Sequence, residues 1–246
     1  MRATRAIFLL LAFGGPAAAA ADPPAPEIAW DQDLAFEHDR ENYQRSLATI
    51  VEDAYRQASA ETGFTLRRSL KVRVHSRAGY ESAFGSGAAW NRGAHYSRGE
   101  IHVNGGNRLD DRFAGAMAHE MVHAVLDHQG TSWRLPTWLN EGLAERVAWQ
   151  RKGLADLAPN QVAELQYAGR QRVLTPLPLR GLARDQYLHC YAAVLFVEKK
   201  AGKEKLLAVV RRTLEGEPFE RALDRETRWS MADVEREFAD WVEHLR

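Results

Sequence analysis

The sequence predicts an α+β protein that is mainly helical, with one small sheet near its N-terminus. Two short segments, Leu70–His75 and Glu100–Asn104, alternate apolar and polar side chains, as strands with one buried face do. Longer segments before and after them repeat their apolar residues at helical spacing. The chain has 246 residues, of which 45% are hydrophobic and 27% charged, and this composition is typical of a globular protein. We expect one domain over residues 38–246.

The first 21 residues have the pattern of a secretory signal peptide. A cationic start, MRATR, is followed by the apolar run AIFLLLAF and then by small residues over Ala17–Ala21. This run is too short for a stable anchor, because a spanning helix needs roughly 20 apolar residues. We therefore expect cleavage after this segment and export of a protein without a membrane span, to the periplasm or the medium. A flexible lead-in over 22–37, which contains the proline-rich PPAP (Pro23–Pro26), would come next.

The charge balance argues against some classes of binding partner, and the cysteine content argues against disulfide and thiol chemistry. The chain has 33 basic and 33 acidic residues and no long basic run, which removes the simplest argument for a nucleic-acid partner or an anionic membrane surface. Cys190 is the single cysteine, so no internal disulfide can form. It lies in the apolar run Tyr187–Val197, which favours a packed thiol over a nucleophile.

The N-terminal part is predicted as one helix followed by the two strands. The helix covers residues 38–60 and stops at Gly63. Between the strands, Phe84–Gly99 is rich in glycine and serine and has no period, which predicts a loop. Its glycines, Trp90 and Tyr96 would suit a flap over a groove, and a plain surface connection is equally compatible with them.

A central helix follows the second strand. Asp110 or Asp111 can cap its first turn, and Gly130 ends it. The next helix begins at Pro136, because proline suits the first helical position, and ends near Gly153. The remaining predicted elements are an extended segment over 175–179 and helices over 185–200, 203–214 and 230–245.

Two histidines and a glutamate on the central helix are spaced as a metal site requires. His119, Glu120 and His123 form an H-E-x-x-H motif. Each helical residue advances about 100°, so His119 and His123 lie about 40° apart and can aim both rings at one point. Glu120 falls beside that point, where its carboxylate can act as a base toward a water.

The third ligand is predicted on the next helix. If that helix returns antiparallel to the central one, it brings Glu141 toward both histidines, and two histidines with one carboxylate form a known zinc site with an open position. Glu145, one turn later, would accept the free N–H of a ligand histidine, and Asn140 would help to orient the region. The alternatives are a helix with solvated histidines and a closed structural zinc, for which no fourth ligand is close in sequence.

HEMVH (His119–His123) followed by LPTWLNEGLAE (Leu135–Glu145) resembles the gluzincin clan of zinc metallopeptidases, and more narrowly the peptidase MA-like domain proteins of bacteria. The likeness spans roughly residues 70–202. It implies a small N-terminal sheet packed on a metal-binding helix pair, with a helical C-terminal part. It also implies one Zn²⁺ ion and a peptide or protein substrate.

The resemblance implies a role for each residue that matches its motifs. Zinc would be bound by His119, His123 and Glu141. Glu120 would be the general base, and a tyrosine from a later helix would stabilise the oxyanion. Tyr187 is the first choice for that tyrosine and Tyr191, one turn on, is the second; both are also compatible with core tyrosines. The strand ahead of the metal helix would pair with extended substrate, which assigns that role to Ile101, His102 and Val103.

Three functions are compatible with these residues. The first is an exported zinc metallopeptidase. The second is a catalytically idle, zinc-containing binding or scaffold protein of the cell envelope. The third is a hydrolase of another bond, such as a cell-wall cross-link peptide. All three share the zinc site and differ in the cleft around it.

Overall fold

The computed structural model describes residues 24–31, 40–85, 93–130, 132–151, 156–182 and 186–246. The predicted signal peptide over 1–21, the part of the predicted flap around Trp90 and the predicted helix end near Gly153 lie outside these residues. Within the ranges described, no helix is both long enough and apolar enough to cross a membrane.

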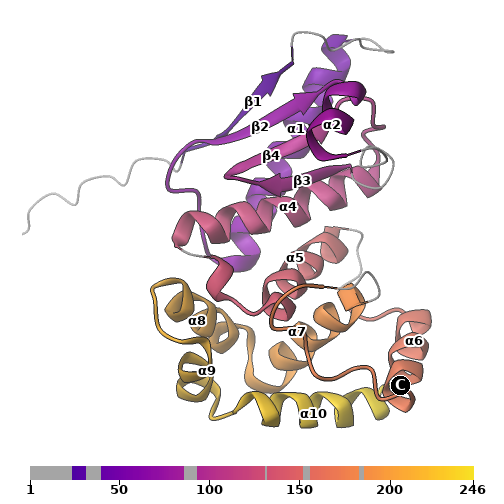
Figure 1. Cartoon of the computed structure of the whole chain (residues 1–246), viewed down its shortest axis with the longest axis vertical. Coiled ribbons are helices and arrows are strands. Elements are labelled where there is room, and N and C mark those ends of the chain that lie inside the picture. The colour runs from indigo at the N-terminus through magenta and orange to yellow at the C-terminus, as the bar shows by residue number, and fades with distance from the viewer. Residues whose placement is uncertain (1–23, 32–39, 86–92, 131, 152–155, 183–185) are drawn as a thin grey trace, which may run out of the picture.

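Four strands form one sheet in the order β1-β2-β4-β3 (Figure 1). They are β1 (Pro26–Trp30), β2 (Leu70–His75), β3 (Ala94–Ser97) and β4 (Glu100–Asn104). β1, β2 and β4 are parallel, and β3 pairs antiparallel with β4 at one edge of the sheet. The two strands predicted from alternating side chains are confirmed with the predicted bounds, β2 and β4.

Two strands lie where the sequence predicted none. The expectation of a flexible lead-in over 22–37 is wrong for Pro26–Trp30, because this segment pairs with β2 along its whole length. The predicted loop Phe84–Gly99 contains β3, which a two-residue turn joins to β4. Arg98 and Gly99 form this turn with φ values of 53° and 82°, and left-handed residues match the twist of a hairpin. Both strands form because they pair with a neighbouring strand. Such pairing leaves no periodic pattern in the sequence of the strand itself.

Helices cover both faces of the sheet. α1 (Arg40–Thr62) and α4 (Asp111–Gln129) pack on the face that carries the buried side chains Val72, Val74, Ile101 and Val103. α2 (Arg77–Phe84), which the sequence did not predict, lies on the opposite face, where its aromatic rings contact His75 and His102. The side chain of Asp110 caps α4 by accepting the N–H of Phe113 at 3.0 Å, as predicted.

The described elements that follow the sheet are helical, and α4 joins them to the sheet half of the molecule (Figure 1). α4 packs against α5, and α5 packs against α7. The C-terminal helices are α5 (Thr137–Arg151), α6 (Pro159–Arg170), α7 (Tyr187–Ala201), α8 (Lys203–Leu214), α9 (Phe219–Thr227) and α10 (Met231–Glu243). The structure is therefore mainly helical with one small sheet, as the sequence predicts, although α6 and α9 were not predicted.

Candidate metal centre

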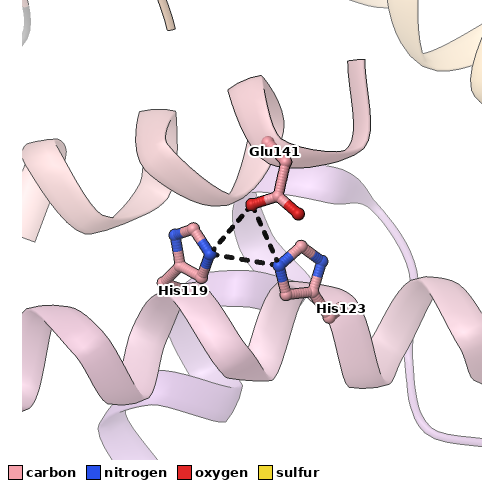
Figure 2. A group of neighbouring side chains, drawn as sticks. All are labelled: His119, His123 and Glu141. Atoms are coloured by element: carbon pink, nitrogen blue, oxygen red, sulfur yellow. Dashed lines mark hydrogen bonds and ion pairs between the residues drawn. The ribbon is translucent and has the colours of Figure 1, made fainter. Parts of the chain in front are cut away.

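The two histidines of α4 and Glu141 of α5 converge on one point (Figure 2). The Nε2 atoms of His119 and His123 lie 3.1 Å apart. Glu141 Oε2 lies 3.3 Å from the first of these nitrogens and 3.6 Å from the second. The antiparallel approach of α5 therefore brings together the three residues that the sequence proposed as ligands.

These separations fit a tetrahedral ion. Ligands that lie about 2.0–2.1 Å from zinc in tetrahedral geometry are about 3.3 Å from one another. The three atoms of His119, His123 and Glu141 are 3.1, 3.3 and 3.6 Å apart. Two imidazole nitrogens and one carboxylate oxygen are also a donor set that zinc accepts. The residues present thus fit this metal in both geometry and chemistry.

The other nitrogen of each ring contacts a hydrogen-bond acceptor. His119 Nδ1 lies 3.1 Å from Glu145 Oε1, and His123 Nδ1 lies 3.2 Å from Asn140 Oδ1. Trp149 donates its Nε1–H to the second oxygen of Glu145 at 2.9 Å, which fixes that carboxylate. In the neutral tautomer that donates its Nδ1–H to such an oxygen, Nε2 keeps its lone pair for the shared point. Glu145 and Asn140 are therefore placed to set the tautomers of the two rings.

The glutamates and histidines of the cluster shift one another's pKa values. Burial opposes the charged form of His119, but Glu141 and Glu145 outweigh it and hold the pKa of this ring well above its ordinary value. Burial likewise opposes the charged form of Glu141, yet His119 and His123 hold its pKa far below the usual range. A carboxylate and two imidazoles that converge in this way favour a positive charge between them.

Glu120 lies beside the cluster and is held by the edge strand. Its Oε2 accepts the backbone N–H of Tyr96 at 2.7 Å. The Tyr96 hydroxyl donates to Asp127 Oδ2 at 2.7 Å, and Ser132 donates to the other oxygen of Asp127 at 2.9 Å. Burial and Asp127 both raise the pKa of Tyr96. Tyr96 thus fastens β3 to α4 at two points, a contact that sequence reasoning missed because β3 lay within a predicted loop.

Tyr187 and Tyr191 occupy different environments although they are one turn apart on α7. Tyr187 lines the cleft, is 38% exposed, and has its ring centroid 6.2 Å from that of His119. Tyr191 is fully buried and stacks on Trp149. Its hydroxyl has no hydrogen-bond partner within the described ranges, and burial raises its pKa to about 12. The structure places Tyr187, and not Tyr191, at the cleft.

The prediction that Ile101, His102 and Val103 pair with substrate is wrong. These residues belong to β4, which pairs with β2 on one side and with β3 on the other. Their backbone groups are therefore engaged within the sheet. Among the described strands, the edge strand beside α4 is β3, and the N–H of its Tyr96 donates to Glu120.

An open cleft of about 730 Å³ contains the three candidate ligands together with Glu120 and Tyr187. It is bounded by β3, α4, α5 and the start of α7. Cys190 of α7 lies outside the cleft lining and is fully buried, and burial raises the pKa of its thiol to about 12. The prediction that the Cys190 thiol is packed in the core agrees with its burial.

No protein-family model matches the sequence, and no curated protein matches it. Among solved structures, the chain is similar to a crystal structure of a two-domain M1 zinc metallopeptidase, a mutant bound to L-arginine. The similarity covers 90% of this chain and 48% of that chain, with 15% sequence identity and a TM-score of 0.48. The chain thus spans about half the length of that structure.

Proposed function

We propose that this chain is a zinc-dependent hydrolase of peptide bonds, of the gluzincin type that its motifs resemble. The observation that carries the proposal is the convergence of His119 Nε2, His123 Nε2 and Glu141 Oε2 within 3.1–3.6 Å of one another in an open cleft. A glutamate, Glu120, lines the same cleft next to them.

His119, His123 and Glu141 would hold the ion, and all three line the open cleft. A bound zinc supplies a lowered pKa for water, toward about 7, and polarisation of a scissile carbonyl. Glu120 accepts a proton from the attacking water and passes it to the leaving amine. The Tyr96 N–H holds one oxygen of Glu120, so that the carboxylate keeps a fixed orientation while it exchanges the proton.

Tyr187 is the residue that we assign to the oxyanion. Its side chain is partly exposed in the cleft, and its ring lies near that of His119. A phenol O–H placed there can donate to the negative oxygen that forms when water attacks the carbonyl.

The test is a comparison of wild type with Glu120→Gln and His123→Ala, by metal analysis and by cleavage of a peptide library. Glu120→Gln is expected to retain one zinc and to lose about 10²–10⁴-fold in turnover, the usual contribution of a general base. His123→Ala is expected to lose both zinc and turnover. If Glu120→Gln cleaves peptides at the wild-type rate, the base is misassigned. Zinc binding without cleavage by the wild type would favour the idle envelope-protein alternative.

We also propose that the enzyme acts after export, to the periplasm or the medium, because the pattern of the first 21 residues is that of a signal peptide. N-terminal sequencing of the exported protein tests this proposal. A start near residue 22 is expected, and a cell-associated protein that retains residue 1 would contradict it.

A further inference from the structure

One end of the cleft carries two arginines that the proposed chemistry does not use. Arg108, in the connection from β4 to α4, and Arg112, in the first turn of α4, both line the cleft and are both exposed. Neither has an ion pair with a carboxylate among the residues that the structure describes. Asp110, at the same end, is engaged as the cap of α4 through the N–H of Phe113. The two guanidinium groups are therefore available to a ligand.

β3 and α4, which both line the cleft, run in the same direction (Figure 1). At the arginine end, a Cβ on Gly93 would lie 3.1 Å from the ring of Phe113. Three residues later, the N–H of Tyr96 reaches Glu120, which is seven residues after Phe113. Three strand residues and seven helical residues both span about 10 Å, so the two elements stay in step.

This direction fixes the polarity of an extended peptide that lies in the cleft along the outer edge of β3. A peptide that lies antiparallel to β3 runs toward Gly93, so the part beyond the scissile bond points to Arg108 and Arg112. A peptide in the parallel direction would bring its N-terminal side, with a positive amine, toward the same two cations. Charge complementarity therefore selects the antiparallel peptide with a carboxylate at the arginine end.

The distance sets the position of that carboxylate. Arg112 precedes Glu120 by eight residues, which is about 12 Å along the helix axis. An extended peptide covers about 3.3–3.6 Å per residue, so this distance corresponds to about three residues. Arginine is also the side chain best suited to bind a carboxylate through two parallel N–H groups.

We infer that Arg108 and Arg112 form a carboxylate-binding subsite, so that the enzyme prefers peptides with a carboxylate about three residues beyond the scissile bond. This inference rests on the proposed function. The carboxylate can come from a free C-terminus or from an Asp or Glu side chain, and the two sources share the chemistry that the arginines recognise.

Binding of labelled peptides to the full chain in the Glu120→Gln background, with excess zinc, tests the inference without consuming the peptide. Four peptides differ only at the third position beyond the intended scissile bond: a free C-terminal acid, its amide, and amidated peptides with Glu or Gln there. We expect the free acid to bind about tenfold more tightly than its amide, or the Glu peptide about tenfold more tightly than the Gln peptide. The preference that appears identifies the source of the carboxylate. This preference should decrease as salt is raised, because exposed charges are screened.

The double substitution Arg108→Gln with Arg112→Gln is expected to abolish the preference. The matched control, Arg170→Gln with Arg221→Gln, removes two exposed arginines of α6 and α9 and should retain it. Equal binding of all four peptides, or an unchanged preference in the Arg108/Arg112 variant, overturns the inference. Cleavage by wild type is measured separately: cleavage without a carboxylate preference contradicts only the subsite, whereas a preference without cleavage contradicts only the peptidase.

Discussion

Gly142 of α5 lies directly against the Cys190 carbonyl of α7. A Cβ placed on Gly142 would be 2.4 Å from that oxygen and 2.6 Å from the Cγ2 atom of Val194. Real Cβ atoms do not approach so closely, so the two helices can lie at this separation only because residue 142 is glycine. Glu141, the adjacent residue, owes its position over the two histidines to this packing.

Gly142→Ala is expected to separate α5 from α7 and to move Glu141. Overpacking of this kind lowers the free energy of unfolding by about 1–3 kcal/mol, even though alanine favours the helix more than glycine does. Denaturant unfolding of the metal-free protein and zinc titration measure the two effects. Gly169→Ala in α6 is the control, because its Cβ would meet only side-chain ends, the Cδ1 of Leu174 at 3.2 Å and the Cγ1 of Val242 at 4.0 Å. Wild-type stability and zinc affinity for Gly142→Ala would contradict this role.

Asn140 is expected to control zinc affinity through the tautomer of His123. Its Oδ1 lies 3.2 Å from His123 Nδ1, so Asn140→Leu removes the acceptor and leaves the ring free to protonate Nε2. Loss of such a contact typically weakens metal binding about 10–100-fold. Asn140→Asp retains an acceptor oxygen and should bind zinc at least as tightly as wild type. Competition with a chromogenic chelator measures the zinc dissociation constants of both variants. Equal zinc affinities for the two variants would show that the contact between Asn140 and His123 does not control zinc binding.

The two tyrosines of α7 are expected to respond differently to loss of the hydroxyl. Tyr187→Phe should lower kcat about 10²–10³-fold with zinc retained, as loss of an oxyanion donor does. Tyr191→Phe should leave kcat unchanged, because the buried hydroxyl of Tyr191 has no partner within the described part of the chain. Steady-state kinetics on one peptide compares them. A similar kcat for Tyr187→Phe and wild type would contradict the assignment of Tyr187 as the oxyanion donor.

His128, near the end of α4, is expected to make stability depend on pH. It is 4% exposed, neither ring nitrogen has a partner within the described ranges, and burial lowers its pKa. The ordinary pKa of a histidine is about 6.5, so below this pH the unfolded chain binds a proton at His128 that the folded chain does not bind. The free energy of unfolding therefore falls as the pH falls. Well above pH 6.5 both states are neutral at this residue, and its contribution no longer changes with pH.

His128→Leu removes this proton uptake and is expected to be stabilised relative to wild type increasingly as the pH falls below 6.5. Urea unfolding of both proteins from pH 7.5 to 5.5 measures the difference in free energy of unfolding. A difference that stays constant over this interval would show that His128 is not responsible.

The cluster of His119, His123 and Glu141 was predictable because it depends on local periodicity. The four-residue spacing of His119 and His123 fixes their common face, and a strongly marked helix after a short connection returns Glu141 to them. The role of Tyr96 was not predictable, since β3 has only four residues and its contacts with Glu120 and Asp127 are distant in sequence. For the same reason the sequence did not reveal that β3, and not β4, is the edge strand of the sheet.

Other features depend on the packing of whole helices, which no short pattern reveals. The need for glycine at 142 follows from the crossing of α5 with α7, and the separation of Tyr187 from Tyr191 follows from where α7 leaves the cleft. Likewise, β1 forms because its backbone pairs with β2, and not because its own sequence alternates apolar and polar residues.

Anomalous diffraction at the zinc absorption edge, from crystals of the wild-type protein grown with zinc, tests the central claim most directly. We predict one strong peak bonded at about 2.0–2.2 Å to His119 Nε2, His123 Nε2 and a Glu141 oxygen, with no fourth protein ligand. A peak elsewhere, a fourth protein ligand, or no zinc at these residues would contradict it.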